Sequence, residues 1–258
     1  MLELTDAQIS GWVAQFMLPL FRVAGMLMVM PVIGTQLVPT RIRLYLALAI
    51  CVVLVPNLPP MPHVEAINLR SFMLIAEQVI IGVMFGLCLQ LFFQVFILAG
   101  QIIAIQMGLG FASMVDPSSG VSVPVLGQFM LMLVTLLFLA MNGHLVALEI
   151  LAESFAAFPA GQSVFVGHFW ELAGRLSWVL GAGLLLTLPA VTALLIINLA
   201  FGVMTRAAPQ LNIFSIGFPL TLALGLVIFW ISLSDFGSLF QGLLSEALEH
   251  LSQFALVR

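Results

Sequence analysis

Lysine is absent from this 258-residue sequence, and charged side chains of any kind make up only 7% of it. A soluble domain usually carries about 25% charged residues, because charges keep its surface in contact with water. Hydrophobic residues make up 62% of this chain. The scarcity of charge therefore excludes an ordinary soluble protein and predicts a surface that faces lipid or other apolar protein.

The few polar and reactive residues form no pattern typical of catalysis or metal binding. All seven basic residues are scattered arginines and the net charge is −4, so we expect no nucleic-acid partner. Cys51 and Cys88 lie inside apolar runs, where a cysteine usually acts as a small buried hydrophobe. The four histidines lack metal-ligand spacing, and no local catalytic set or phosphate-binding glycine loop occurs. We therefore expect no metal, no cofactor and no enzymatic activity.

Apolar runs dominate the chain and predict an all-α membrane protein of about six long helices, several of them kinked or broken. At ~1.5 Å per residue, the third and fifth runs would each be about 50 Å long, whereas the hydrocarbon core of a bilayer is ~30 Å thick. Tilt, a break at Pro189 or cover by other subunits would each accommodate that length. Such uneven lengths favour a subunit of a larger assembly. The six runs cover residues 12–32, 44–55, 71–107, 124–151, 169–204 and 213–233, and an amphipathic tail follows.

Some polar side chains inside these runs are candidates for contacts between helices or between subunits. Gln90, Gln94 and Gln101 fall within about 40° of one another on a helix, and this stripe should face protein or water. Arg22 lies in the first run, where a charge is costly unless it is paired. Glu77 is a possible partner, and we expect a structural contact more than a role in transport.

The segment from residue 107 to residue 124 combines helix breakers with bulky apolar side chains. Irregular backbone at membrane depth is tolerated only where protein buries it or where it lines a water-filled cavity. A pore plug fits this composition, and so does a re-entrant turn that merely packs. Asp116 is expected to cap a helix that begins at Pro117 rather than to bind an ion. The candidate plug residues are Gly108, Leu109, Gly110, Phe111, Ala112, Ser113, Met114, Val115, Asp116 and Pro117.

Two further helix ends are predicted from local sequence. Pro209 disfavours helix in the residue before it, Asn212 can cap the sixth helix, and Arg206 favours the negative end of the fifth. The turn between the fifth and sixth helices can also contact a neighbouring subunit. At the end of the fourth run, Gly143 is expected to form a left-handed C-cap.

Several stretches, taken together, resemble the FliR family of flagellar export proteins. The most distinctive is QMGLGFASMVDP at 106–117. Others are FRVAGMLMVMPVIG at 21–34, PTRIR at 39–43, LFLAMNGH at 137–144 and GVMTRAAPQLNIFSIGFPLTL at 202–222. The resemblance extends from the first apolar run to the sixth and covers nearly the whole chain.

The resemblance implies a subunit of the flagellar type III export gate in the bacterial inner membrane, within the flagellar basal body. Members assemble with FliP-type and FliQ-type subunits into a helical cone around a closed pore, next to an FlhB-type switch protein. They help to pass flagellar proteins through that pore. Residues 1–160 would form a FliP-like part whose loop at 107–124 is the plug, and residues 161–258 a FliQ-like hairpin.

Two other functions remain open at this point. An injectisome export subunit would share the architecture. A small-molecule or ion carrier would place acidic groups in paired, interrupted helices near mid-membrane, but the candidates Glu77 and Asp116 are not symmetrically placed. A carrier would be complete alone or as a homo-oligomer, whereas a gate subunit would need partners.

Overall fold

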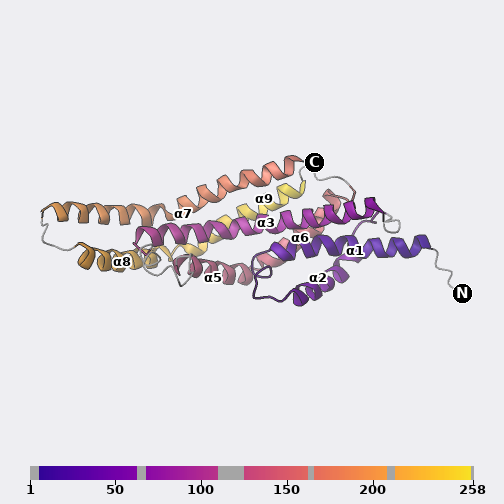
Figure 1. Ribbon diagram of the computed structural model, residues 1–258, viewed down its shortest axis with the longest axis horizontal. Coiled ribbons are helices and arrows are strands. Elements are labelled where there is room, and N and C mark those ends of the chain that lie inside the picture. Colours follow the sequence, from indigo (N-terminus) through magenta and orange to yellow (C-terminus); the bar gives the residue numbers. More distant parts are fainter. Residues whose placement is uncertain (1–5, 63–67, 110–124, 162–165, 208–212, 257–258) are drawn as a thin grey trace. The chain divides into compact units, whose positions relative to one another are not determined.

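The computed structural model describes residues 6–62, 68–109, 125–161, 166–207 and 213–256, and within these ranges the chain forms helices joined by short turns and loops. The described residues form eight α-helices, one short 3-10 helix and no strand (Figure 1), which confirms the all-α prediction. The helices are α1 Asp6–Val29, α2 Thr40–Leu54, α3 Leu69–Gln106, α5 Val125–Ala140, α6 Gly143–Ala157, α7 Val166–Ala207, α8 Ile213–Ser232 and α9 Phe236–Leu256, and the 3-10 helix η1 is Val55–Asn57.

Four of these helices are long and apolar enough to cross a membrane, judged by length and composition. The number rises to six if each of two bent pairs, α5 with α6 and α8 with α9, counts as one span. α3 has 38 residues and α7 has 42, so they are about 57 Å and 63 Å long at ~1.5 Å per residue. Both exceed the ~30 Å hydrocarbon core, as the apolar runs predicted.

The fourth apolar run is divided into α5 and α6, which meet at an angle of 68°. The left-handed residue at this bend is Asn142, with a φ of 57°, so the prediction for Gly143 was wrong. Asparagine tolerates this conformation better than most residues. Gly143 instead begins α6, and a β-carbon there would lie 2.5 Å from Cε2 of Phe138. The glycine is therefore required by the packing of that ring.

The fifth apolar run forms one continuous helix, so the possible break at Pro189 does not occur. Hydroxyl groups supply additional hydrogen bonds beside the proline. Thr187 donates to the carbonyl of Leu184 at 2.9 Å, and Thr192 donates to the carbonyl of Leu188 at 2.8 Å. Threonine hydroxyls commonly satisfy backbone groups near a proline in membrane helices.

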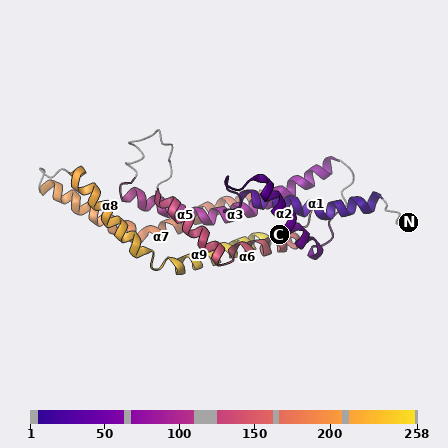
Figure 2. The same ribbon diagram turned by 90° about the horizontal axis from the view of Figure 1, so that it is seen from below.

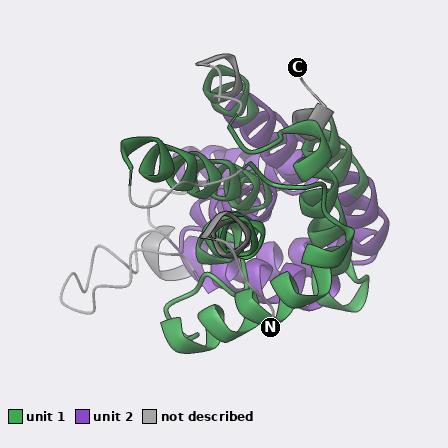
Figure 3. Cartoon of the chain, turned by 90° about the vertical axis from the view of Figure 1, so that its right-hand side faces the viewer, with its two compact units in different colours: residues 1–91, 138–175, 245–258 green, residues 92–137, 176–244 purple. Residues whose placement is uncertain are grey.

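The chain forms two compact units (Figure 3). Unit 1 comprises Met1–Leu91, Phe138–Arg175 and Ser245–Arg258, and unit 2 comprises Phe92–Leu137 and Leu176–Leu244. In unit 1, α1 lies alongside the first half of α3, as both Figure 1 and Figure 2 show. Glycines permit this approach: a β-carbon at Gly25 would lie 2.7 Å from the carbonyl oxygen of Val79, and one at Gly86 would lie 2.8 Å from that of Met26.

Unit 2 has an aromatic core. Phe92 and Phe96 of α3 have ring centroids 5.3 Å apart, and Phe92 lies 5.6 Å from Phe240 of α9. Phe96 also lies 5.6 Å from Phe236. These are edge-to-face contacts, the arrangement that aromatic rings prefer. Residues more than 130 positions apart thus meet around α3.

Candidate functional site

The predicted plug segment begins where α3 ends, and the end of that helix is closed by a specific motif. Gly108 has a φ of +83°, a left-handed conformation that glycine adopts readily. The Leu109 N–H donates to the Ala104 carbonyl and the Gly108 N–H to the Ile105 carbonyl, both at 3.0 Å. This pair of bonds defines a Schellman motif, which satisfies the last carbonyls of the helix and turns the chain away from it.

The residues that flank the segment on either side pack closely within unit 2. Met107 is fully buried, and its side chain lies against Gly225 of α8, where a β-carbon would be 2.5 Å from Cγ of Met107. At the other end, a β-carbon on Gly100 of α3 would be 2.7 Å from the carbonyl oxygen of Leu126 on α5. Gly225 and Gly100 were missed by the sequence analysis, since nothing local distinguishes them from other glycines in apolar runs.

Only the first two candidate plug residues, Gly108 and Leu109, belong to the described part of the chain. The rest, residues 110–117, lie outside it, and so do Pro209 and Asn212. Arg206 is exposed at the end of α7.

The glutamine stripe lies on α3, ahead of the Schellman motif. Gln90, Gln94 and Gln101 are each half-buried, whereas Leu89, Phe93 and several neighbouring residues on the helix are almost completely buried. Their side chains take part in none of the hydrogen bonds between described residues. An amide at such a position can bond to water or to another polypeptide.

Arg22 is fully buried in unit 1 and bonds to residues of two other segments. Its Nε donates to Oε1 of Gln78 at 2.8 Å, and its Nη1 donates to the carbonyl and Oγ of Ser154 at 3.0 and 3.1 Å. Its Nη2 donates to the carbonyl of Phe158 at 2.7 Å. The guanidinium also lies 4.1 Å from the centroid of the Phe155 ring. We call these five residues the Arg22 cluster.

Gln78, rather than Glu77, is therefore the α3 partner of Arg22. Adjacent helix positions differ by about 100° in direction, so only one of the two can point at α1. The cluster holds a cation with neutral acceptors, and the carbonyls of Ser154 and Phe158 belong to the C-terminal end of α6. The partial negative charge of a helix C-terminus favours a cation at this place.

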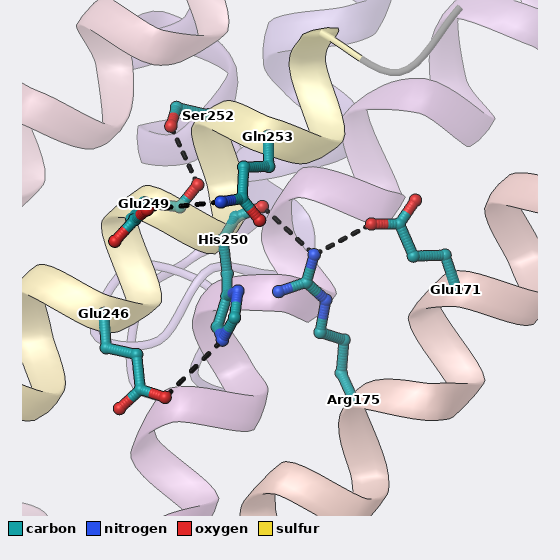
Figure 4. A network of polar contacts seen from close by, with 7 residues as sticks. All are labelled: Glu171, Arg175, Glu246, Glu249, His250, Ser252 and Gln253. Carbon is teal, nitrogen blue, oxygen red and sulfur yellow. Dashed lines mark hydrogen bonds and ion pairs between the residues drawn. The ribbon is translucent and has the colours of Figure 1, made fainter.

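A second polar network joins the start of α7 to the last turns of α9 (Figure 4). Nη2 of Arg175 donates to Oε1 of Glu171 at 2.9 Å and to the carbonyl of His250 at 3.4 Å. Nε2 of His250 lies 3.7 Å from Oε1 of Glu246. The sequence analysis missed the Glu171–Arg175 pair, although its spacing of four residues on a helix was a usable signal.

These features describe a class of protein. In its described residues the chain is an all-helical membrane protein with several candidate spans and no group of three potential metal-ligating side chains. Its sequence is more specific: the chain belongs to the bacterial export proteins, family 1, whose family model matches residues 13–247.

Individual relatives are similar over most of their length. The chain is 40% identical over 227 residues to flagellar biosynthetic protein FliR of Escherichia coli (strain K12). The alignment covers 88% of this chain and 87% of the E. coli protein. It is 36% identical to the FliR protein of Pectobacterium carotovorum subsp. carotovorum, and the alignment covers 88% of this chain and 87% of that protein. It is 32% identical to that of Buchnera aphidicola subsp. Acyrthosiphon pisum (strain APS), with 89% of each covered.

Proposed function

We propose that this protein is the FliR-type subunit of the flagellar type III protein-export gate. The observation that carries the proposal is its similarity to FliR proteins over almost the full length of both chains. The flagellar names of these relatives favour a flagellar gate over an injectisome. In this role the chain is a structural subunit, and its substrates are the exported flagellar proteins.

Assembly with FliP-type and FliQ-type subunits, close to an FlhB-type protein, is part of the proposal. Its physical support is the apolar surface of α7, which is longer than a bilayer can cover. Leu185 is 68% exposed and Leu199 is 70% exposed, and this helix carries no charged residue between Arg175 and Arg206. That charge-free stretch of 30 residues is about 45 Å long, against ~30 Å of hydrocarbon. Other subunits would cover the remainder.

The proposed architecture divides the chain into a FliP-like part, residues 1–160, and a FliQ-like hairpin, residues 161–258. The assembly would lie in the inner membrane, within the flagellar basal body. Residues 108–117 would close its pore in the resting state. This assignment is supported by the Schellman motif at Gly108, which ends α3 abruptly, and by the buried Met107 that fixes the start of the segment.

Copurification tests the proposal against the alternative of a carrier. An affinity-tagged chain extracted in mild detergent is expected to bring down FliP-type and FliQ-type polypeptides in a fixed ratio. Deleting the partner genes should then leave it aggregated or degraded, because the α7 surface would be uncovered. A stable, monodisperse chain obtained without any partner would contradict the gate proposal and favour a carrier.

A further inference from the structure

α2 buries very little of its surface within the chain. Of its residues only Ala47 and Cys51, one turn apart, are buried. Arg43, Leu48, Ile50 and Leu54 are half-buried, and the remaining side chains are exposed. Among the exposed ones, Tyr45, Val52 and Val53 are 68%, 62% and 69% exposed. The helix therefore touches the rest of unit 1 along one narrow stripe and presents a broad apolar face to its surroundings.

The composition of this outward face differs from that of the helix contacts inside the chain. Those contacts use glycine, as at Gly25, Gly86 and Gly100, where backbones approach closely. Helix interfaces in membranes are generally enriched in small residues and in polar groups that bond across the interface. From Ile42 to Leu54 there is no Gly, Ser, Thr, Asn or Gln, and Ala49 is the one small outward residue. Branched aliphatic side chains of this kind suit fluid acyl chains better than a neighbouring helix.

The charged residues in the stretch from position 7 to position 64, which includes α2, are all basic. No Asp or Glu occurs at positions 7–64, whereas the same stretch contains three arginines. Arg22 is bonded inside unit 1, and Nη2 of Arg43 donates to the carbonyls of Thr35 and Val38, each at 2.8 Å. Arg41 is exposed and takes part in no hydrogen bond or ion pair between described residues. This uncompensated cation at one end of an apolar face is complementary to an anion.

The dimensions of α2 match this arrangement. With η1 it spans 18 residues, Thr40–Asn57, which is about 27 Å and close to the ~30 Å hydrocarbon core. Arg41 lies at one end of that length, and Tyr45, the one tyrosine of the chain, lies one turn further along the same side. Arginine and tyrosine are typical of the headgroup level of a membrane. We propose that the outward face of α2 contacts bilayer lipid directly, with the Arg41 guanidinium bound to the phosphate of an anionic phospholipid.

Site-specific photo-crosslinking in the intact complex tests this proposal. A benzophenone amino acid is placed at Leu44, beside Arg41, and separately at Val53, near the other end of the exposed face. The complex that copurifies from cells is exchanged into nanodiscs containing equal amounts of phosphatidylglycerol and phosphatidylcholine, irradiated and analysed by mass spectrometry. Both positions are expected to form lipid adducts. At position 44 phosphatidylglycerol should be preferred about fivefold, the effect of one basic residue at an anionic surface.

Charge variants make the result specific. Arg41→Gln should reduce the preference at position 44 to near parity and Arg41→Lys should retain it, while Arg206→Gln, a change in the exposed arginine of α7, should have no effect. Adducts with another protein subunit in place of lipid would show that a partner covers α2 and would overturn the proposal. A preference unchanged by Arg41→Gln, or the absence of lipid adducts at both positions, would overturn it as well.

Discussion

The two units of this protein differ in how many charged and polar residues they contain and in how those residues are used. Of its seven basic and eleven acidic residues, three lie in unit 2, namely Asp116, Arg206 and Asp235. The other fifteen belong to unit 1, which also contains the Arg22 cluster and the α7–α9 polar network. Among the described residues, unit 1 therefore combines directional polar contacts between helices with packing, whereas the aromatic core of unit 2 joins its helices by packing.

The buried polar groups of the two units show the same contrast. In unit 1, Arg22 and Gln78 are completely buried and bond to each other across two helices. In unit 2, Thr187 and Thr221 are buried, but each hydroxyl donates to a carbonyl of its own helix. Polar contacts thus connect different helices in unit 1, whereas in unit 2 Phe92, Phe96 and Phe240 perform that task. Substitutions in the two units should consequently fail for different reasons.

The largest effect is expected from Arg22→Leu. The substitution removes the guanidinium, so Oε1 of Gln78 and the carbonyls of Ser154 and Phe158 each lose the hydrogen bond that Arg22 donates to them. Breaking such a buried, charge-assisted set costs about 4 kcal/mol. The midpoint of thermal unfolding of the purified complex should fall sharply, and the amount of complex in cells should fall with it.

Arg70→Leu is the matched control for that variant, because it removes an exposed arginine from the same unit. It should leave the unfolding midpoint almost unchanged. If Arg22→Leu were equally well tolerated, the polar cluster would have no part in holding α1, α3 and α6 together.

A slightly smaller effect is expected from Phe240→Ala in unit 2. Phe240 is fully buried and contacts Phe92 and Phe96, so its removal leaves a cavity and costs about 3 kcal/mol. Phe240→Leu should recover most of this loss, because leucine is also apolar and fills much of the cavity that alanine leaves. Thermal unfolding of the complex measures both variants, and equal losses for leucine and alanine would contradict a packing role.

An intermediate effect is expected from Gly82→Ala. A β-carbon at Gly82 would collide with the carbonyl oxygen of Arg22, so the methyl group forces α1 and α3 apart at a cost of about 2 kcal/mol. Gly181→Ala in α7 is the control, because a β-carbon there meets nothing within 4 Å. That variant should be neutral or slightly stabilising, as alanine favours helix. Indistinguishable unfolding midpoints for the two would show that the close approach is unimportant.

The smallest effect is expected from Glu171→Gln. It breaks the ion pair with Arg175 at the start of α7, where the two side chains are 31% and 14% exposed. A partly exposed pair of this type contributes about 0.5 kcal/mol. A shift of the unfolding midpoint comparable to that of Arg22→Leu would mean that the α7–α9 network, and not the Arg22 cluster, is the main polar support of unit 1.

The sequence predicted those parts of the fold that depend on local composition. Apolar runs located the helices, and Gly108 was correctly included among the helix breakers after α3. Contacts between distant segments were not predictable in this way. Whether Gln78 or Glu77 contacts Arg22 depends on how α3 is oriented about its own axis, which local sequence does not specify. Phe96 and Phe236 are 140 positions apart, so their contact depends on the tertiary fold. Pro189 shows the converse, because it is a strong local signal for a helix break, yet α7 continues through it.

The central claim is that residues 108–117 close a pore in an assembled export gate. Deleting Phe111 to Val115 tests it most directly, with conductance measured in cells that assemble the gate and in cells that lack the partner subunits. The account predicts increased ion leakage in the first cells and none in the second. Conductance that stays at the level of the undeleted protein, in a gate shown to be assembled, would contradict it.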